Sequence, residues 1–466
     1  MRLPSFLYAI LATSAPCLGL ATSQIYEAEE GSPLGQTRLA LTSSDNTARI
    51  FVTCFKHPGD GVEITVRTPE TGYYFLELGY ACDADKRVPI AVNGNAQGSR
   101  FFPKTAGFSE QRYGRIFLTS GEHVIEIGTD WGYIDLDYIR FVPADAPEPF
   151  QLATAPVNPR ASAEARQLFT KLTADFGHRT WSGQHEANPA APTRLAHIAQ
   201  LTQGAAPALL GLDLLFYSGA WNRPEGDGAI EKARDWALHE NGIVTLSWHW
   251  FAPGGFSARV WDSFWTDKTT FNLGQLTDET SVEYRAIIED LDRIASKLKI
   301  LRDAGVPVLW RPLHEAEGRW FWWGAGGTAA SKHLYLLMFD RFTRIHRLDN
   351  LLWVWTSTDD PDAINWYPGD DYVDIIATDL YSPAGTRGDF FTVFDTLRER
   401  YQGRKPIALG ECGVIPELST HAPWLWFLTW DDFITREDMN PPDHVARIFA
   451  DPRVVNRPPS AAPSTR

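Results

Sequence analysis

The sequence predicts two domains, an antiparallel β-sandwich followed by a (β/α)8 barrel of parallel strands. Residues 24–143 contain short runs that alternate apolar and polar side chains, whereas residues 163–450 contain apolar runs separated by amphipathic helices. A proline-rich stretch at residues 144–162 divides the two patterns. A chain of 466 residues is long enough for two domains with separate cores.

The first region is expected to be a jelly-roll sandwich, because its strands are short and turn residues separate them. The clearest strand patterns lie at Gly61–Val66, Tyr73–Leu78, Val88–Val92 and His123–Ile127. Asn93-Gly94 has the composition of a tight hairpin turn. After these strands, prolines favour an extended, semi-stiff linker over a packed element.

The second region alternates strands with helices. Between Tyr284 and Leu301, apolar residues recur at spacings of three and four, which predicts one buried face of a helix. Continuous apolar runs indicate strands that are covered on both faces, as in a parallel sheet. Eight such runs occur, at residues 179–182, 208–212, 243–247, 306–310, 351–355, 373–377, 406–409 and 424–428. Eight strands favour a closed barrel; the alternative, a doubly wound open sheet, lacks a G-x-G-x-x-G or P-loop motif.

Composition excludes several classes of function. The 43 basic and 58 acidic residues give a net charge of −15, which disfavours binding to nucleic acid or to an acidic membrane face. Aromatic side chains are abundant, and 17 of the 18 tryptophans follow Gly177. Flat apolar rings of this kind can stack on ligands, so we expect several of them in a binding cleft.

The first 21 residues resemble a secretory signal peptide, with Arg2, an apolar stretch from Leu3 to Ala12 and small residues near Ala21. The apolar stretch is too short to span a bilayer, so we expect a secreted, extracellular protein without a membrane anchor. In an oxidising compartment Cys54 and Cys82 could form a disulfide. Cys412 is expected to be a buried free thiol, and residues 451–466 a C-terminal tail.

Polar residues gather where the predicted barrel strands end, which is where barrel enzymes carry their chemistry. The relevant segments are Trp248-His249-Trp250, Arg311 to Glu315, Thr378 to Tyr381, Gly410 to Gly413 and Trp430 to Asp432. Glu315 and Glu411 would face each other across the barrel mouth. Hydrolysis of a glycosidic bond uses such a pair, an acid and a nucleophile about 5–5.5 Å apart when configuration is retained.

Other catalytic constellations have weaker support. His239-Glu240 precedes Asn241-Gly242, which is typical of a solvated helix end, and His185-Glu186 could line the cleft or lie outside it. A catalytic metal site would need an H-E-x-x-H helix or a cysteine cluster, and a serine nucleophile would need G-x-S-x-G, and the sequence contains none of these motifs.

The segment Trp310 to Gly324, with Gly410 to Gly413, resembles glycoside hydrolase family 26, best known for endo-β-1,4-mannanases. The resemblance implies that Glu315 is the acid/base and Glu411 the nucleophile. It also implies roles at the cleaved sugar for other residues: His314 supports the acid/base, Trp320 and Tyr381 contact the sugar, Tyr381 bonds the nucleophile, and Asp379 matches less specifically. By position alone, Trp248, His249 and Trp250 are candidates for more distant sugars on the nonreducing side, and Trp430 is a candidate platform.

Residues Tyr26 to Glu29 and Trp131 to Ile139 are similar to carbohydrate-binding module family 35. That family implies a jelly roll, often with a structural calcium ion, for which Glu27, Glu29 and Asp137 are the matching oxygen donors. Trp131 is the single tryptophan of this half, and it is either a sugar platform or a core residue at the end of the sandwich.

Together these resemblances predict a secreted, monomeric, retaining endo-β-1,4-mannanase without a catalytic cofactor. Its expected partners are β-mannan polysaccharide, including galactomannan and glucomannan, and manno-oligosaccharides. Two alternatives stay open: a hydrolase of another β-glycan, such as β-1,3-xylan or mixed-linkage glucan, and a non-catalytic polysaccharide-binding protein. With the front module acting as a tether, truncation before Ser162 is expected to leave activity on soluble galactomannan nearly intact.

Overall fold

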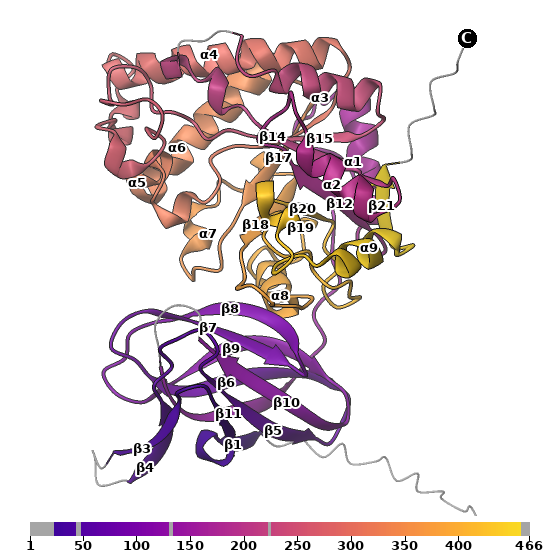
Figure 1. Cartoon of the computed structure of the whole chain (residues 1–466). Coiled ribbons are helices and arrows are strands. Elements are labelled where there is room, and N and C mark those ends of the chain that lie inside the picture. Colours follow the sequence, from indigo (N-terminus) through magenta and orange to yellow (C-terminus); the bar gives the residue numbers. More distant parts are fainter. Residues whose placement is uncertain (1–22, 43–47, 130–133, 222–224, 458–466) are drawn as a thin grey trace, which may run out of the picture.

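The computed structural model describes residues 23–42, 48–129, 134–221 and 225–457 (Figure 1). It consists of an N-terminal domain of antiparallel sheets and a C-terminal parallel barrel, so the predicted fold class is confirmed. The predicted signal peptide lies outside the described residues. Within the described part of the chain, no helix is both long and apolar enough to cross a membrane.

The N-terminal domain, called the module below, is a sandwich of two antiparallel sheets. One has the order β3-β4-β11-β6-β9 with β1 added to β11, and the other has the order β2-β5-β10-β7-β8. Apolar side chains of alternate residues fill the space between them, as at Val62, Ile64 and Val66 of β5. The strands are β1 (Gln24–Glu27), β2 (Ser32–Leu34), β3 (Arg38–Thr42), β4 (Arg49–Thr53), β5 (Gly61–Thr68), β6 (Gly72–Ala81), β7 (Lys86–Val92), β8 (Asn95–Phe102), β9 (Ser109–Leu118), β10 (Gly121–Gly128) and β11 (Asp135–Ala144).

Local features of the module agree in part with the sequence-based expectations. Asn93 and Gly94 both have positive φ angles, 52° and 76°, as the tight turn between β7 and β8 requires. The predicted disulfide is absent, because Cys54 and Cys82 are free thiols. The Cys82 thiol instead donates to the carbonyl oxygen of Pro103 at 3.2 Å.

The second domain is a closed barrel in which β12 pairs with β20. Its strands are β12 (Thr180–His185), β14 (Leu209–Asp213), β15 (Ile243–Ser247), β16 (Val308–Arg311), β17 (Leu351–Thr356), β18 (Ile375–Leu380), β19 (Ile407–Cys412) and β20 (Trp426–Thr429). The α-helices are α1 (Ala163–Asp175), α2 (Thr193–Leu201), α3 (Ala229–Leu238), α4 (Val282–Asp303), α5 (Trp322–Ala325), α6 (Gly327–Asp340), α7 (Ala363–Trp366), α8 (Phe391–Arg400) and α9 (Pro442–Ala450).

Each apolar run that was expected to form a barrel strand does so. The predicted apolar face of α4 is fully buried, including Ile287, Leu291 and Leu298. Cys412 is a buried free thiol, as predicted. The expected C-terminal tail needs correction: β21 (Val454–Arg457) pairs with β12 and with the short β13 (Ala206–Pro207), so the barrel domain extends at least to Arg457.

The proline-rich segment 145–162 has no helix or strand, but it packs against the barrel. The Phe150 ring packs edge-on against Phe176 of the barrel at 4.8 Å between centroids. The Val157 N–H donates to Asp374 Oδ1 at 2.7 Å. The linker therefore holds the module near the barrel through specific contacts.

The module also docks directly on the barrel, where β8 and β9 face α8 and the chain before it (Figure 1). The Ala96 N–H donates to the Arg387 carbonyl at 2.7 Å, and the Ala96 carbonyl accepts from the Phe390 N–H at 3.1 Å. Close backbone approach requires Gly388, because a Cβ there would lie 2.2 Å from the Ala96 oxygen. These contacts fix the module in one position on the barrel.

Ion pairs strengthen the docking. Arg115 of β9 bonds to Asp395 at 2.6 Å and to Glu399 at 2.7 Å, both on α8. The Asp395 side chain is 2% exposed, so the charge it brings into the interface depends on Arg115 for compensation. The His421 ring of the barrel stacks on Phe117 of β9 with 4.1 Å between centroids.

Candidate active site

Three carboxylates meet at the carboxyl ends of three barrel strands. Glu315 follows β16, Asp379 belongs to β18 and Glu411 to β19. An oxygen atom of each lies within 4.8 Å of an oxygen of the other two. The structure thus brings together Glu315 and Glu411, which come from distant parts of the sequence, in the arrangement expected at a barrel mouth.

The Arg311 guanidinium, buried at the end of β16, binds two of these carboxylates. It donates to Asp379 Oδ2 at 3.0 Å and forms a close ion pair with Glu411. Burial alone would lower the pKa of Arg311, but the charges of Asp379 and Glu411 outweigh it and raise that pKa. The guanidinium therefore stays charged and compensates the buried anions. Sequence reasoning assigned no role to Arg311, although its place at a strand end beside Glu315 was a usable signal.

Glu315 and Glu411 lie in different electrostatic surroundings. Burial raises the pKa of Glu315, and the nearby negative charge of Glu411 raises it further. Glu411 instead accepts hydrogen bonds from Arg311 and, at 2.5 Å, from the Tyr381 hydroxyl. Trp320 Nε1 donates to Glu315 Oε2 at 3.0 Å. This environment favours a protonated Glu315 beside a Glu411 that a guanidinium and a hydroxyl hold in place.

Asp379 is the third member of the cluster. Its side chain is 2% exposed, and burial raises its pKa while Arg311 opposes that effect. Because Asp379 binds the same guanidinium as Glu411, it anchors Arg311 in the orientation that reaches Glu411. Asp379 thus supports the cleaved-sugar site through Arg311.

The loop after β16 has an unusual backbone. Leu313, Glu315 and Arg319 have φ angles of 52°, 55° and 59°, in the left-handed region that non-glycine residues rarely adopt. Each such residue costs roughly 1–3 kcal/mol unless the surroundings enforce it. The Trp323 indole helps to enforce this backbone conformation, because it donates a hydrogen bond to the His314 carbonyl at 2.8 Å. The strain therefore coincides with the loop that carries Glu315.

A chain of polar side chains runs from His314, next to Glu315, into the barrel. Asp213 Oδ2 lies 2.6 Å from His249 Nδ1, and His249 Nε2 lies 3.1 Å from His314 Nε2. Burial acts to lower the pKa of His249, but Asp213 outweighs it and raises that pKa. Burial lowers the pKa of His314, which favours His249 as the donor and a neutral His314 as the acceptor of this hydrogen bond. Asp213 was missed in the sequence, although it ends the second barrel strand.

The tryptophans predicted as sugar contacts fall into two groups. Trp248 and Trp250 are 1% and 0% exposed and stack on each other at 3.9 Å, so neither ring has a free face for a sugar, and that prediction was wrong. In contrast, Trp320 and Tyr381 are each 42% exposed beside the carboxylates. Trp430 is half-buried and stacks on His185 at 3.8 Å.

Sequence reasoning missed an aromatic group in the long loop after β15. Trp261 is 58% exposed and Trp265 is 39% exposed. The Trp261 ring packs near Phe216 and Trp221 in the loop after β14. Exposed indole rings of this kind can stack on pyranose rings. The tryptophans of this aromatic-rich loop were the signal that the sequence offered.

The predicted calcium donors lie near one another in the module. Burial raises the pKa of Glu27, and the charges of Glu29 and Asp137 raise it further. Glu29 Oε2 is buried without a hydrogen-bond partner in the described part of the chain, whereas Asp137 forms an ion pair with Arg49. Glu27 and Glu29 therefore fit a hard cation, and Asp137 is engaged elsewhere. Trp131 lies outside the described residues.

Comparison with known proteins agrees with this architecture. The family model "Glycosyl hydrolase family 26" matches residues 157–459, and "Carbohydrate binding module (family 35)" matches residues 24–144. The chain is 36% identical to a mannan endo-1,4-beta-mannosidase of Thermothelomyces thermophilus, over 95% of this chain and 92% of that protein.

Two solved structures share the fold. One is a family 26 β-(1,4)-mannanase with a family 35 carbohydrate-binding module from Podospora anserina; it has a TM-score of 0.64 and 34% identity, over 93% of this chain and 97% of that one. The other is a β-mannanase from a symbiotic protist of the termite Reticulitermes speratus, in complex with a gluco-manno-oligosaccharide. It has a TM-score of 0.62 and 33% identity, over 67% of this chain and 100% of that one.

Proposed function

The chain belongs to glycosyl hydrolase family 26, and we propose that it is a retaining endo-β-1,4-mannanase that cuts internal bonds of mannan, galactomannan and glucomannan. One observation carries the proposal: oxygens of Glu315 and Glu411 lie within 4.8 Å at the barrel mouth, where burial raises the pKa of Glu315 and Arg311 and Tyr381 bind Glu411. That separation is typical of a nucleophile and an acid that act on one anomeric carbon with retention. The likeness to mannan endo-1,4-beta-mannosidases supports mannan as the substrate.

In the first step, a Glu411 oxygen attacks the anomeric carbon and forms a covalent glycosyl ester. The bond from that carbon to the leaving oxygen breaks, and Glu315 transfers its proton to this oxygen, which departs as the hydroxyl of the released chain. Tyr381 and Arg311 hold Glu411 in place through its two carboxylate oxygens. Glu411 therefore approaches the sugar in a fixed orientation.

In the second step, water attacks the same carbon and Glu315, now a carboxylate, accepts a proton from it. The bond to Glu411 breaks, the sugar is released with its original configuration, and Glu315 is protonated again. Loss of the Glu411 charge in the ester removes one cause of the raised Glu315 pKa. Glu315 is thus a stronger acid in the intermediate, which suits its change from proton donor to acceptor.

Chemical rescue tests this assignment. We expect Glu411→Ala to fold normally and to lose about 10⁴-fold or more of kcat on mannan. With an activated mannoside and added azide, the vacated side should admit the anion and yield an α-glycosyl azide. The control is Glu279→Ala, at an exposed position before α4, which should match the wild type. Near-normal hydrolysis by Glu411→Ala, or a β-azide product, would contradict the mechanism.

A substrate panel tests the specificity. Reducing ends released from mannan, galactomannan and glucomannan should far exceed those from β-1,3-xylan and mixed-linkage glucan. A fast fall in the viscosity of galactomannan relative to sugar release would identify internal cleavage. Preference for xylan or mixed-linkage glucan would point to the alternative hydrolases, and binding without hydrolysis would point to a non-catalytic protein.

Two further proposals concern the N-terminal region. We propose that residues 1–21 direct secretion and are removed; N-terminal sequencing of secreted protein should find no Met1.

We also propose that Glu27 and Glu29 hold a structural calcium ion, which would neutralise their mutual repulsion. Chelation should then lower the melting temperature of the wild type, and Glu29→Gln should abolish that dependence. An unchanged melting temperature would refute the calcium site.

A further inference from the structure

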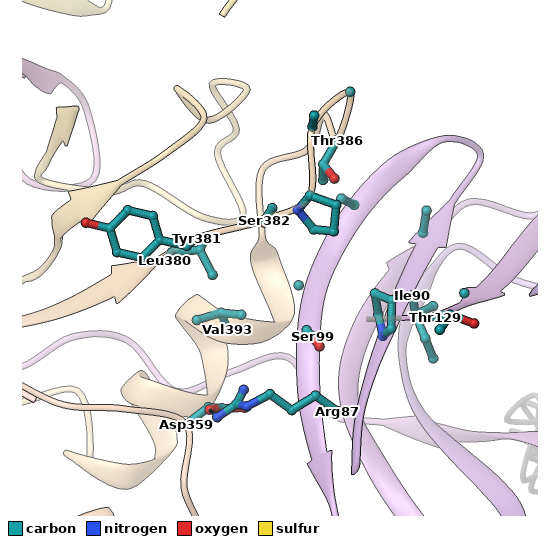
Figure 2. Close-up of a pocket in the computed structure, with 18 of the residues that line it drawn as sticks. Arg87, Ile90, Ser99, Thr129, Asp359, Leu380, Tyr381, Ser382, Thr386 and Val393 are labelled. Atoms are coloured by element: carbon teal, nitrogen blue, oxygen red, sulfur yellow. Dashed lines mark hydrogen bonds and ion pairs between the residues drawn. The ribbon is translucent and has the colours of Figure 1, made fainter. Parts of the chain in front are cut away.

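A cleft of about 560 Å³ lies between the module and the barrel mouth (Figure 2). Glu315, Trp320 and Tyr381 line it on the barrel side, and the loop Ser382 to Arg387 continues the same wall. The opposite wall consists of module residues from β7, β8 and β10, among them Ile90 and Ser99. The cleft is therefore continuous with the carboxylate cluster, and a second domain forms one of its sides.

The module cannot swing away from this position without breaking specific contacts. The backbone of Ala96 is hydrogen-bonded to Phe390 and to Arg387, which lines the cleft, and Arg115 is paired with the buried Asp395. At the far side of the cleft, Arg87 of β7 forms an ion pair with Asp359 of the barrel (Figure 2). The wall that the module contributes is thus preorganised, which reduces the entropy cost of binding.

Two residues that line this cleft, Ser99 and Asp359, each have a buried side-chain oxygen without a hydrogen-bond partner among the described residues, Ser99 Oγ and Asp359 Oδ2. The Asp359 side chain is 10% exposed, and its other oxygen is held by Arg87. A buried polar atom without a partner costs roughly 1–3 kcal/mol. One of these residues belongs to each domain, and hydroxyl and carboxylate side chains at the wall of a cleft favour a ligand rich in hydroxyl groups.

The position of the cleft indicates which part of the substrate it accepts. Glu315 lines it, and Glu411 is not among its lining residues. In the proposed mechanism Glu315 protonates the oxygen of the leaving chain, so that chain departs on the Glu315 side. The cleft runs from there past the loops that follow β17 and β18. The exposed Trp261 and Trp265 follow β15 and do not line this cleft.

We propose that this cleft binds the sugars on the leaving-group side of the cleaved bond, and that the module supplies one wall of that site. The proposal rests on the proposed mannanase function. The module thus takes part in positioning soluble substrate for cleavage, in addition to any tethering to polysaccharide. This proposal replaces the earlier expectation that a chain without the module keeps its activity on soluble galactomannan. A chain without the module should instead lose part of that activity.

Point variants of the full-length chain test the proposal. Ser99→Tyr places a ring in the cleft from the module side, and Ser99→Ala removes the unpartnered hydroxyl with little change of shape. Ser109→Tyr is the matched control, because Ser109 is an exposed residue of β9 that does not line the cleft. The substrates are manno-oligosaccharides labelled at the reducing end and an aryl β-mannotrioside, whose leaving group contains no sugar.

We expect Ser99→Tyr to lower kcat/KM on mannohexaose about tenfold or more and to shorten the labelled products, because fewer sugars fit beyond the cleaved bond. Ser99→Ala should lower it about threefold to tenfold, as for the loss of one hydrogen bond. Hydrolysis of the aryl mannotrioside should stay within twofold of the wild type. Ser109→Tyr should match the wild type on both substrates.

The outcomes separate the two levels of inference. A wild-type chain that hydrolyses neither substrate refutes the mannanase proposal, and the cleft assignment falls with it. If the wild type is active, unchanged rates and products in both Ser99 variants refute the cleft assignment alone. Equal losses on the oligosaccharide and the aryl substrate, or longer labelled products, would also refute it, because the defect would then lie outside the leaving-group side.

Discussion

The hydrogen bond from Trp320 to Glu315 offers a direct test of how the acid is tuned. The indole N–H donates to Glu315 Oε2 at 3.0 Å, which favours the carboxylate and opposes the raised pKa that burial and Glu411 produce. A hydrogen bond to a charged group contributes about 1.5–3 kcal/mol when buried. Because Trp320 is 42% exposed, solvent screening reduces this to about 1 kcal/mol.

Trp320→Phe keeps a ring for the sugar and removes the donor. At about 1.36 kcal/mol per pKa unit, the pKa of Glu315 should rise by roughly half to one unit. Glu315 would then stay protonated to higher pH, so the high-pH limb of the profile of kcat/KM should move upward by the same amount. Lost sugar contacts change the height of that profile and not the position of its limb.

The assay is kcat/KM on mannohexaose across the pH range, since this ratio reports the free enzyme. Trp265→Phe is the matched control: Trp265 is similarly exposed, at 39%, and its ring packs on Phe321 instead of bonding to Glu315. Its high-pH limb should not move. A limb that stays in place or moves downward in Trp320→Phe would refute the role of this hydrogen bond.

Three other variants test separate parts of the structure. Tyr381→Phe removes the 2.5 Å hydrogen bond to Glu411 and should lower kcat about 10- to 100-fold. The melting temperature should stay close to that of the wild type. An unchanged kcat would contradict the role of Tyr381 in positioning Glu411. Arg115→Ala leaves the buried Asp395 without its partner and should lower the free energy of unfolding by about 3–5 kcal/mol in urea titrations. A loss under about 1 kcal/mol, as for an exposed ion pair, would contradict the role of Arg115. Burial raises the pKa of Glu317 from 4.5 to about 8, so between these values the folded chain holds a proton that the unfolded chain lacks, and stability falls as pH rises. Glu317→Gln should flatten that part of the curve of unfolding free energy against pH, and an equally steep curve would show that Glu317 is ionised in the folded chain.

Much of the barrel could be predicted from the sequence because its strands are buried on both faces and read as apolar runs. Glu315 and Glu411 were found for the same reason, since each follows or ends such a run. Trp248 and Trp250 were placed wrongly because side chains alternate along an extended chain. Of these three consecutive residues, His249 bonds to Asp213 and His314, and its two neighbours are buried in the core.

Other features depend on contacts that leave little trace in a single sequence. The docking of the module rests on small residues such as Ala96 and Gly388, which allow close backbone approach and have no periodic pattern. Arg311 and Asp213 act through partners more than 30 residues away. Pairings over such separations become visible when the fold places the strands side by side.

The backbone pairing at Ala96 has a consequence for isolated modules. Strand β8 is the outermost strand of its sheet, and the barrel segment from Arg387 to Phe390 pairs with the N–H and C=O groups of Ala96 on its free edge. A module separated from its barrel would present these groups to solvent, where another chain can add a strand and start aggregation. Grafting this module onto a different enzyme should therefore require a new cap for β8, such as an outward-facing lysine or a proline.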